Sequence, residues 1–327
     1  MREIAIRDAI KEAMSEEMRR DPNVFLVGEE VGAYNGAYKC SKGMLEEFGA
    51  KRVIDAPIAE SGFAGIGVGA AMAGLRPIVE FMTFNFSLVA IDHILNSAAK
   101  THLMSAGAIK CPIVFRGAGG AASQLSAQHG NSFEHFYAYT PGLVVVAPST
   151  PYDFKGLLKS SIRNDNPVCF FESEMTYSLK GPVPEEEYLI PLGKADIKRS
   201  GTDLTIISWS KNVFLALQVA EDLAAQGVSA EVLDLRTLRP LDTEAVLKSA
   251  AKTHRVLVIQ EQHEVASYGA YISHLIHDKV FDELDAPVKL VSSLEVPIPY
   301  SKALDVLVLP SKERCMLAAQ AVLMGRV

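Results

Sequence analysis

A single carboxylate at a strand-to-helix junction is the most informative chemical feature of this sequence. Glu60 follows a short apolar strand that is expected to end at Asp55, and a Gly/Ala-rich helix is predicted to begin directly after it. Its apolar neighbours Ile58, Phe63 and Ile66 predict that it is buried. A buried carboxyl group without a charge partner has a raised pKa and can exchange a proton near neutral pH. We therefore expect a catalytic role for Glu60, although a carboxylate that merely complements the helix dipole would look similar.

A long polar loop carries a second candidate. Residues 116–132 follow a predicted strand, are rich in glycine and contain His129 among polar neighbours. Long loops of this kind in compact domains are usually functional or mobile. Because imidazole changes its charge near neutral pH, His129 is a candidate for proton transfer. His135 lies among aromatic residues and is expected to be packed instead.

Three phenylalanines, Phe81, Phe84 and Phe86, lie at the end of another predicted strand. Phenylalanines usually pack in the core. The carboxyl ends of strands in α/β sheets are also where ligands bind, so a ring at this position could stack on a flat ligand. Glu60 and this strand end follow neighbouring strands in the chain, and one pocket could hold both.

The glycines of the predicted helix raise a competing interpretation. Residues 65–70 (Gly-Ile-Gly-Val-Gly-Ala) fit the relaxed dinucleotide-binding pattern G-x-G-x-x-A. That pattern belongs in the turn between a strand and the helix that follows it. Here the glycines lie inside a helical stretch, about ten residues after the strand. A nicotinamide-dependent dehydrogenase therefore stays as a distant alternative.

Length and composition exclude several classes of protein. At 327 residues the chain exceeds the size at which single cores stop growing, so two domains are expected. The net charge of −7 and the lack of a basic run argue against a nucleic-acid surface. No apolar run approaches the ~20 residues that span a membrane. The four cysteines are scattered and form no C-x-x-C pair, which predicts reduced core thiols and neither a disulfide framework nor a zinc site.

The N-terminal residues lead almost at once into a predicted amphipathic helix. This leaves no room for a signal or transit peptide unless one was removed earlier. The expected location is therefore the cytoplasm, or the interior of an organelle if a leader has been removed.

The chain alternates apolar strands with amphipathic helices, which predicts an α/β fold of two doubly wound, mostly parallel-sheet domains. In the first half we expect helices at residues 6–20, 60–75, 86–104 and 152–164, and strands at 24–27, 52–54, 77–81, 113–116, 143–147 and 168–171. Residues 181–188 contain two prolines and three glutamates and are interpreted as a connector. A second set follows, with strands at 204–209, 230–233, 256–260 and 288–291 and helices at 213–225, 243–251, 268–280 and 312–323. The expected domains are residues 1–185 and 196–327.

Several of these segments together resemble the β-subunit family of the pyruvate dehydrogenase first component. The resemblance runs from the first helix to residues 296–300, and its most specific part is the run from residue 55 to 86. The related branched-chain 2-oxo acid enzymes share the Glu60 region but differ after Glu80, so pyruvate is favoured as the substrate. The β subunit of a branched-chain 2-oxo acid or acetoin dehydrogenase remains the alternative. The matching segments are residues 29–31, 36–39, 55–65, 80–86, 112–117, 127–129 and 238–240.

The resemblance implies a thiamine diphosphate enzyme with a transketolase-like pyrimidine-binding domain and a transketolase-like C-terminal domain. Such an enzyme decarboxylates pyruvate oxidatively and passes the acetyl group to a lipoyl domain. Glu60 would hydrogen-bond the aminopyrimidine ring of the cofactor and favour its imino tautomer, whose exocyclic nitrogen removes the acidic thiazolium proton. Phe86 would stack on the pyrimidine. His129 would lie beside the substrate carbonyl and the lipoyl arm.

The family holds the diphosphate and magnesium with a Gly-Asp-Gly motif, which this sequence lacks. The resemblance therefore implies that the chain carries half of the site, and that an α subunit supplies the other half and most of the magnesium contacts in an α₂β₂ heterotetramer. A dihydrolipoyl acyltransferase core would be a further partner. A non-catalytic docking subunit with an acidic surface is a third hypothesis, against which the retention of Glu60 and His129 counts.

A potassium ion held largely by main-chain carbonyls is also implied by the resemblance. Its ligands would come from Ile113, Ser161, Ile162, Asn164 and Asn166. Ser161 and Asn164 depart from the residue types that are usual for the family at these positions.

Overall fold

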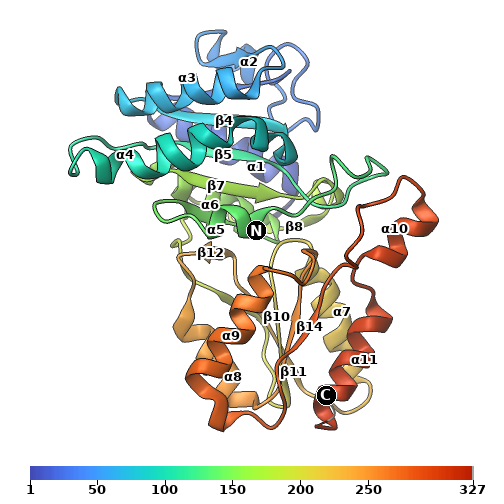
Figure 1. Ribbon diagram of the computed structural model, residues 1–327. Coiled ribbons are helices and arrows are strands. Elements are labelled where there is room, and N and C mark those ends of the chain that lie inside the picture. Colours follow the sequence, from blue (N-terminus) through green and yellow to red (C-terminus); the bar gives the residue numbers. More distant parts are fainter. Residues whose placement is uncertain (326–327) are drawn as a thin grey trace. The chain divides into compact units, whose positions relative to one another are not determined.

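The computed structural model describes residues 1–325, which form two compact units (Figure 1). Unit 1 comprises residues 1–119 and 136–192, and unit 2 comprises residues 120–135 and the chain from residue 193 onward. Each unit has its own sheet and its own hydrophobic core. The expectation of an α/β protein with two mostly parallel sheets is confirmed.

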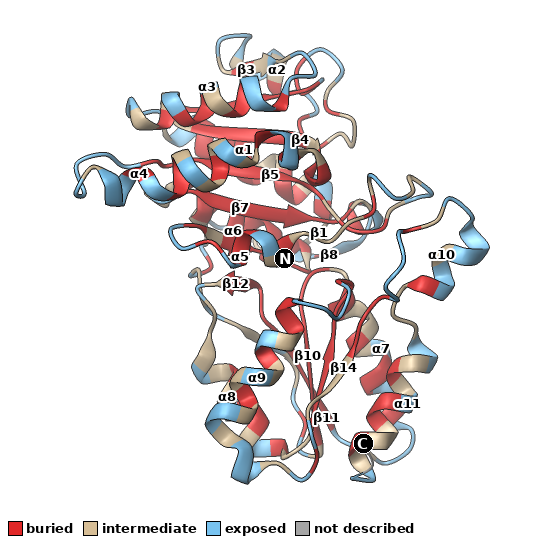
Figure 2. Ribbon diagram, in the orientation of Figure 1, coloured by how far each residue is buried: buried red, intermediate tan, exposed pale blue. Residues whose placement is uncertain are grey.

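The sheet of unit 1 is parallel, and helices cover it. Every strand predicted in this half is present within two residues of its expected bounds. Strands β2, β5 and β7 are buried along their whole length, as Figure 2 shows for the sheet. The strand order is β6 (Val144–Val146), β7 (Val168–Glu172), β5 (Val114–Ala118), β4 (Arg76–Thr83), β2 (Val24–Gly28) and β3 (Val53–Asp55). The longer helices are α1 (Ile6–Arg20), α3 (Glu60–Met72) and α6 (Pro151–Arg163), and shorter ones are α2 (Met44–Phe48), α4 (Ala99–Met104) and α5 (Glu134–Ala138).

One prediction for this unit was wrong. Residues 86–104 do not form one helix but a 3₁₀ helix η1 (Phe84–Ala90), a π helix η2 (His93–Ala98) and α4. The Ser87 hydroxyl donates to the Phe84 carbonyl at 2.6 Å, a local hydrogen bond that competes with regular helix. The expected connector 181–188 begins as strand β8 (Lys180–Val183), which pairs antiparallel with β1 (Arg2–Ala5). A two-stranded sheet has edges only, where proline is tolerated.

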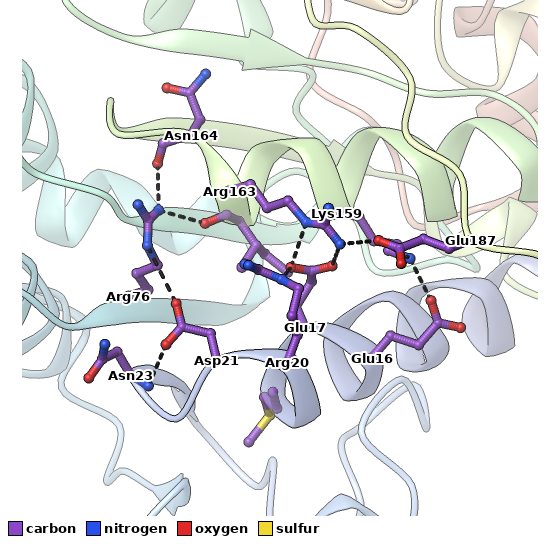
Figure 3. Close-up of polar contacts among 12 residues, drawn as sticks. Glu16, Glu17, Arg20, Asp21, Asn23, Arg76, Lys159, Arg163, Asn164 and Glu187 are labelled. Atoms are coloured by element: carbon purple, nitrogen blue, oxygen red, sulfur yellow. Dashed lines mark hydrogen bonds and ion pairs between the residues drawn. The ribbon is translucent and has the colours of Figure 1, made fainter.

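Helices α1 and α6 are joined by rows of opposite charge spaced four residues apart (Figure 3). Glu16 of α1 lies 2.6 Å from the ammonium group of Lys155 and 2.7 Å from that of Lys159, and both lysines are almost fully buried. Glu17 pairs with Arg163 at 2.7 Å. Burial tends to raise the pKa of Glu16, but the hydrogen bonds of the two lysines outweigh it and lower that pKa. Every buried charge of this contact therefore has a partner, as burial of ions requires.

Unit 2 contains a second sheet, parallel except at one edge. Its strand order is β14 (Lys289–Val291), β13 (Val256–Ile259), β10 (Leu204–Ser208), β11 (Ala230–Asp234) and the antiparallel edge strand β9 (Asp196–Arg199). The four predicted strands and four predicted helices are confirmed; β9 is largely polar and gave no apolar signal. The helices are α7 (Asn212–Ala224), α8 (Thr243–Thr253), α9 (Tyr268–Val280), α10 (Lys302–Val308) and α11 (Lys312–Leu323), and β12 (Thr237–Arg239) is a further short strand.

Residues 120–135 belong to unit 2, although they lie between β5 and the body of α5 in the chain. Glu134 is buried there and accepts a hydrogen bond from the Gln262 amide at 2.9 Å. Burial raises the pKa of Glu134 to about 6, and the charge of Glu261 adds to this, while Gln262 and the charge of Lys211 oppose it. The pKa of this carboxyl group therefore lies above its ordinary value of 4.5.

This shift makes the stability of unit 2 depend on pH. The folded chain keeps a proton that the unfolded chain releases between pH 4.5 and about 6, so the free energy of unfolding falls as the pH rises through that window. We expect Glu134→Gln to remove this loss and to raise the free energy of unfolding by about 2 kcal/mol near pH 7.5 but little at pH 4.5. Denaturant unfolding at both pH values measures the effect. Glu221→Gln, on the exposed side of α7, is the matched control; equal behaviour of the two variants would contradict the prediction.

Candidate active site

The carboxyl ends of three neighbouring strands of unit 1 carry the candidate residues. Strand β2 pairs in parallel with both β3 and β4, so the three strands end at the same edge of the sheet. Glu29 is the first residue after β2, Glu60 is the first residue of α3 after β3, and Phe86 lies in η1 after β4. In α/β sheets this edge is where ligands bind.

The backbone around Glu29 is fixed from both neighbouring strands. Asp55, at the end of β3, accepts hydrogen bonds from the N–H groups of Gly32 at 2.6 Å and Ala33 at 2.9 Å. On the other side, a Cβ atom at Gly28 would lie 2.6 Å from the carbonyl oxygen of Glu80 in β4. Only glycine permits this approach, which brings the residue directly before Glu29 against the neighbouring strand.

Glu29 and Glu60 form a buried pair of carboxyl groups. Each is 8% exposed. Burial, followed by the charge of Glu60 and a hydrogen bond to its side chain, raises the pKa of Glu29. Glu29 therefore keeps its proton to a higher pH than an ordinary carboxyl group does, and it does so directly beside Glu60.

One oxygen of this pair is left without a partner. The Oε1 atom of Glu29 is buried and has no hydrogen bond to any residue in the described part of the chain. A buried polar atom of this kind points to an unfilled ligand contact. The sequence predicted no role for Glu29, although it follows a fully buried strand and lies in the segment 29–31 that resembles the family.

Glu60 is buried as predicted, but not among the neighbours that were expected. Ile58 and Ile66 are 84% and 68% exposed, whereas Phe63 is 3% exposed. Phe63 faces inward from α3, while Ile66 lies with Gly62 on the outer, exposed side of that helix. The burial of Glu60 is therefore due to the sheet edge and Glu29, and the outer side of α3 presents apolar and small residues.

The three phenylalanines divide into two kinds. Phe81 and Phe84 are each 1% exposed, and the Phe84 ring lies 4.2 Å from the ring of Phe171 and 5.3 Å from that of Tyr137, centroid to centroid. Their role is core packing. Phe86 is half-buried and so keeps part of its ring accessible at the strand edge.

His129 is half-buried and is assigned to unit 2, whereas Glu60 and Phe86 are in unit 1. Its backbone N–H donates to the Ser126 carbonyl at 3.2 Å. His135, which was expected to be packed, is half-buried, and burial lowers its pKa. The structure thus groups Glu60 and Phe86 at one edge and places His129 in a separately folded part of the chain.

The residues expected to bind potassium lie around the end of α6. The carbonyl of Ile162 and that of Asn164 both accept hydrogen bonds from the guanidinium of Arg76, at 2.9 and 3.0 Å (Figure 3). The carbonyl of Ser161 accepts from the Asn164 N–H, and that of Ile113 accepts from the N–H of Val168. Asn166 donates to the Asn164 side chain. A protein cation therefore already engages two of the five expected ligands.

Other kinds of site find no support in the described residues. None of their His, Cys, Asp and Glu side chains gather in groups of three or more that could hold a metal ion. The four cysteines are buried and not disulfide-bonded, as predicted. No helix within residues 1–325 is long and apolar enough to cross a membrane.

Comparison with known proteins identifies the family. Residues 2–180 match the transketolase pyrimidine-binding domain and residues 193–315 match the transketolase C-terminal domain. A pyruvate dehydrogenase E1 component subunit beta from Rickettsia conorii is 51% identical over 98% of both chains. The mitochondrial protein of that name from Caenorhabditis elegans is 50% identical over 97% of this chain and 92% of its own.

A solved structure shares the fold. It is a split-gene transketolase, described as an inactive β4 tetramer, which superposes with a TM-score of 0.79 over 99% of both chains at 20% identity. That likeness concerns the fold alone. The family matches cover most of the chain and the curated relatives cover nearly all of it, so this chain belongs to the family of pyruvate dehydrogenase E1 component β subunits, built from the transketolase pyrimidine-binding and C-terminal domains.

Proposed function

We propose that this chain is the β subunit of a thiamine diphosphate-dependent pyruvate dehydrogenase, which decarboxylates pyruvate oxidatively and transfers the acetyl group to the lipoyl domain of an acyltransferase. The observation that carries the proposal is the Glu29–Glu60 carboxyl pair at the edge of the first sheet. A buried carboxyl group that keeps its proton beside a second carboxyl group could supply a proton to a weakly basic ring nitrogen without bulk water.

The residues at this edge fit the pyrimidine half of the cofactor. Thiamine diphosphate, when bound, supplies a carbon nucleophile and an electron sink for decarboxylation. Glu60 would hydrogen-bond the aminopyrimidine ring, and Phe86, half-buried at the same edge, would stack on it. Glu29 would hold the proton that Glu60 exchanges, and its buried Oε1 atom leaves a contact to be filled.

His129 is proposed as the group on the substrate side. It would orient or protonate the reacting oxygen and guide the lipoyl arm, since imidazole can act as donor or acceptor near neutral pH. His129 lies in the loop between strand β5 and helix α5, and residues that contact substrates are often on such loops.

The other half of the site would come from an α subunit in an α₂β₂ heterotetramer. The sequence lacks Gly-Asp-Gly, so the diphosphate and its magnesium would be held mainly by that partner. The outer side of α3, with the exposed residues Gly62, Ile66 and Gly69, and the exposed Ile58 just before that helix, would be covered by another subunit of the tetramer, since small residues allow close approach of another backbone. Unit 2 would contribute a docking surface for the acyltransferase core.

The proposal does not include potassium, because the Arg76 guanidinium hydrogen-bonds two of the carbonyl groups that were expected to bind this ion. Branched-chain 2-oxo acids and acetoin remain alternative substrates; the segment 80–86 favours pyruvate by its resemblance alone. The ratio of kcat/KM for pyruvate to that for a branched-chain 2-oxo acid decides between them.

The first prediction concerns Glu60. Glu60→Gln should leave folding and assembly nearly intact but lower turnover roughly 10²–10⁴-fold, because an amide can hydrogen-bond but cannot exchange the proton. The exchange rate of the cofactor's acidic carbon-bound proton into deuterated water is the direct measurement. Glu46→Gln, at an exposed position of α2, is the control. Exchange at the wild-type rate in Glu60→Gln would remove Glu60 from this role.

The second prediction concerns His129. His129→Ala should reduce acetyl transfer or decarboxylation more than it weakens thiamine diphosphate binding, because His129 is placed on the substrate side. Cofactor dissociation and turnover are measured on the same holoenzyme sample, with His274→Ala, an exposed histidine of α9, as the matched control. A large loss of cofactor affinity with unchanged turnover would assign His129 to the cofactor site instead.

The third prediction concerns the half-site. The isolated chain should neither bind thiamine diphosphate tightly nor decarboxylate pyruvate, because a diphosphate needs a metal or an array of donors to leave water, and the chain itself carries a net charge of −7. Adding the α subunit and magnesium should restore both properties. Calorimetry and pyruvate turnover before and after mixing are the test; micromolar binding with full turnover by the chain alone would contradict it.

A further inference from the structure

The carboxyl edge of the second sheet holds a segment of the chain itself. Strands β10, β13 and β14 are parallel neighbours. Lys211 follows β10, Glu261 follows β13 and Ile298 follows β14, so all three come from the edge where ligands usually bind in such sheets. All three contact residues 120–133, which contain His129 and which we call the histidine loop.

Lys211 and Glu261 together hold one residue near the start of this loop. The ammonium group of Lys211 donates to the carbonyl of Ala121 at 2.8 Å, and a carboxylate oxygen of Glu261 accepts from the N–H of Ala121. The same two side chains pair with each other at 2.6 Å and are only 17% and 7% exposed. Gly120 has φ +78°, and a Cβ atom there would lie 2.7 Å from the Glu261 carboxylate. Both polar groups of Ala121 are therefore fixed by one buried ion pair.

The far end of the loop is held by a second polar contact. Gln262 donates to Glu134 at 2.9 Å, and its own carbonyl group accepts from the Tyr268 N–H at 2.9 Å. The Gly120 N–H donates to the Asn131 carbonyl at 2.9 Å and closes the base of the loop. Because Glu261 and Gln262 are consecutive, one turn after β13 anchors both ends.

The residues beside His129 contact the same scaffold. A Cβ atom at Gly130 would lie 2.9 Å from Cβ of Ile298, so the backbone next to His129 rests directly on that side chain. Ser126, whose carbonyl accepts from the His129 N–H, approaches the Ile298 carbonyl with its hydroxyl at 3.4 Å. Ala121 packs against Ile298 in a small apolar cluster. The position of the His129 backbone is thus set by unit 2.

We propose that Lys211 and Glu261 are positioning residues for His129, so that the C-terminal-type domain holds a residue of the reaction in place through the buried ion pair at Ala121. The inference rests on the role proposed above for His129. Removing the charge of Lys211 leaves the Ala121 carbonyl without its donor and Glu261 buried without a counter-ion, which favours opening of the loop at its base. Displacement of a catalytic group by about 1 Å can cost as much as 10²-fold in rate.

The test uses the holoenzyme with α subunit, magnesium and cofactor, and the variants Lys211→Met, His129→Ala and the double variant. If Lys211 acts through His129, Lys211→Met lowers acetyl transfer to a lipoyl domain roughly tenfold or more in the chain that has His129, but less than about twofold in the His129→Ala chain. An equal loss in both backgrounds would show that Lys211 acts by another route and would overturn the proposal.

Matched variants separate positioning from general loss of stability. Lys211→Arg keeps the charge and should recover most of the activity. Lys312→Met breaks an exposed ion pair with Asp222, 2.8 Å long, in the same unit and should leave activity unchanged. Glu261→Met removes both the acceptor of the Ala121 N–H and the counter-ion of Lys211, and should reproduce the Lys211→Met defect even if Lys211→Met folds poorly.

Amide hydrogen exchange gives a readout that does not depend on the reaction. In Lys211→Met the amides of residues 120–133 should exchange faster than in the wild-type protein, while the amides of β10 and β13 stay protected. If the wild-type holoenzyme does not decarboxylate pyruvate, the proposed function fails, yet the exchange experiment still decides whether the ion pair anchors the loop. Unchanged exchange in the loop, with full activity, would refute the positioning role.

Discussion

The buried guanidinium of Arg116 holds together the strands on which the candidate active site depends. Arg116 lies in β5, and it pairs with Glu80 of β4 on one side and with Glu172 of β7 on the other, the latter through two hydrogen bonds of 2.5 and 2.6 Å. Tyr177 donates to Glu172 at 2.6 Å and completes the set. Removal of one member of such a cluster leaves an uncompensated buried charge, which typically costs about 3–5 kcal/mol. The carbonyl oxygen of Glu80 also lies against Gly28, the residue directly before Glu29. By holding Glu80 in place, the cluster therefore also stabilises the position of the backbone at Glu29.

The same sheet therefore uses buried carboxylates in two ways, and the neighbour decides which. Glu80 and Glu172 face a guanidinium, and although burial lowers the pKa of Arg116, the charges of these two carboxylates hold that pKa well above its usual range. Glu29 faces another carboxyl group, Glu60, and its pKa rises. Burial raises the pKa of Glu80 as well, although the charge of Arg116 opposes that rise. The difference between Glu80 and Glu29 therefore lies in the partner: Glu80 pairs with a cation inside the sheet, whereas Glu29 lies next to another carboxyl group at the strand ends.

The carboxyl edges of the two sheets carry different kinds of residue. In unit 1 the strand ends carry Glu29, Glu60 and Phe86, at the edge where ligands commonly bind in parallel sheets. In unit 2 the equivalent edge is occupied by the histidine loop through Lys211 and Glu261. The two sheets thus use the same kind of edge differently: one carries the candidate site residues, and the other holds a loop of the chain itself. The function lies in these side chains and not in the fold itself.

The sequence alone determined most of the longer helices and strands, because apolar periodicity is a local property of the chain, and its motifs pointed to the family. Helices 6–20, 268–280 and 312–323 were predicted with the observed bounds, and Glu60 was correctly predicted to be buried at the start of α3. The tertiary structure decided which distant residues meet. The pairing of Glu29 with Glu60 depends on β2 and β3 being neighbours, and the assignment of His129 to unit 2 depends on contacts across more than a hundred residues, such as Ala121 with Glu261. Apolar periodicity indicates which face of a segment is buried. Which residues that face packs against depends on strand order and loop closure, because these bring together segments that are far apart in the chain.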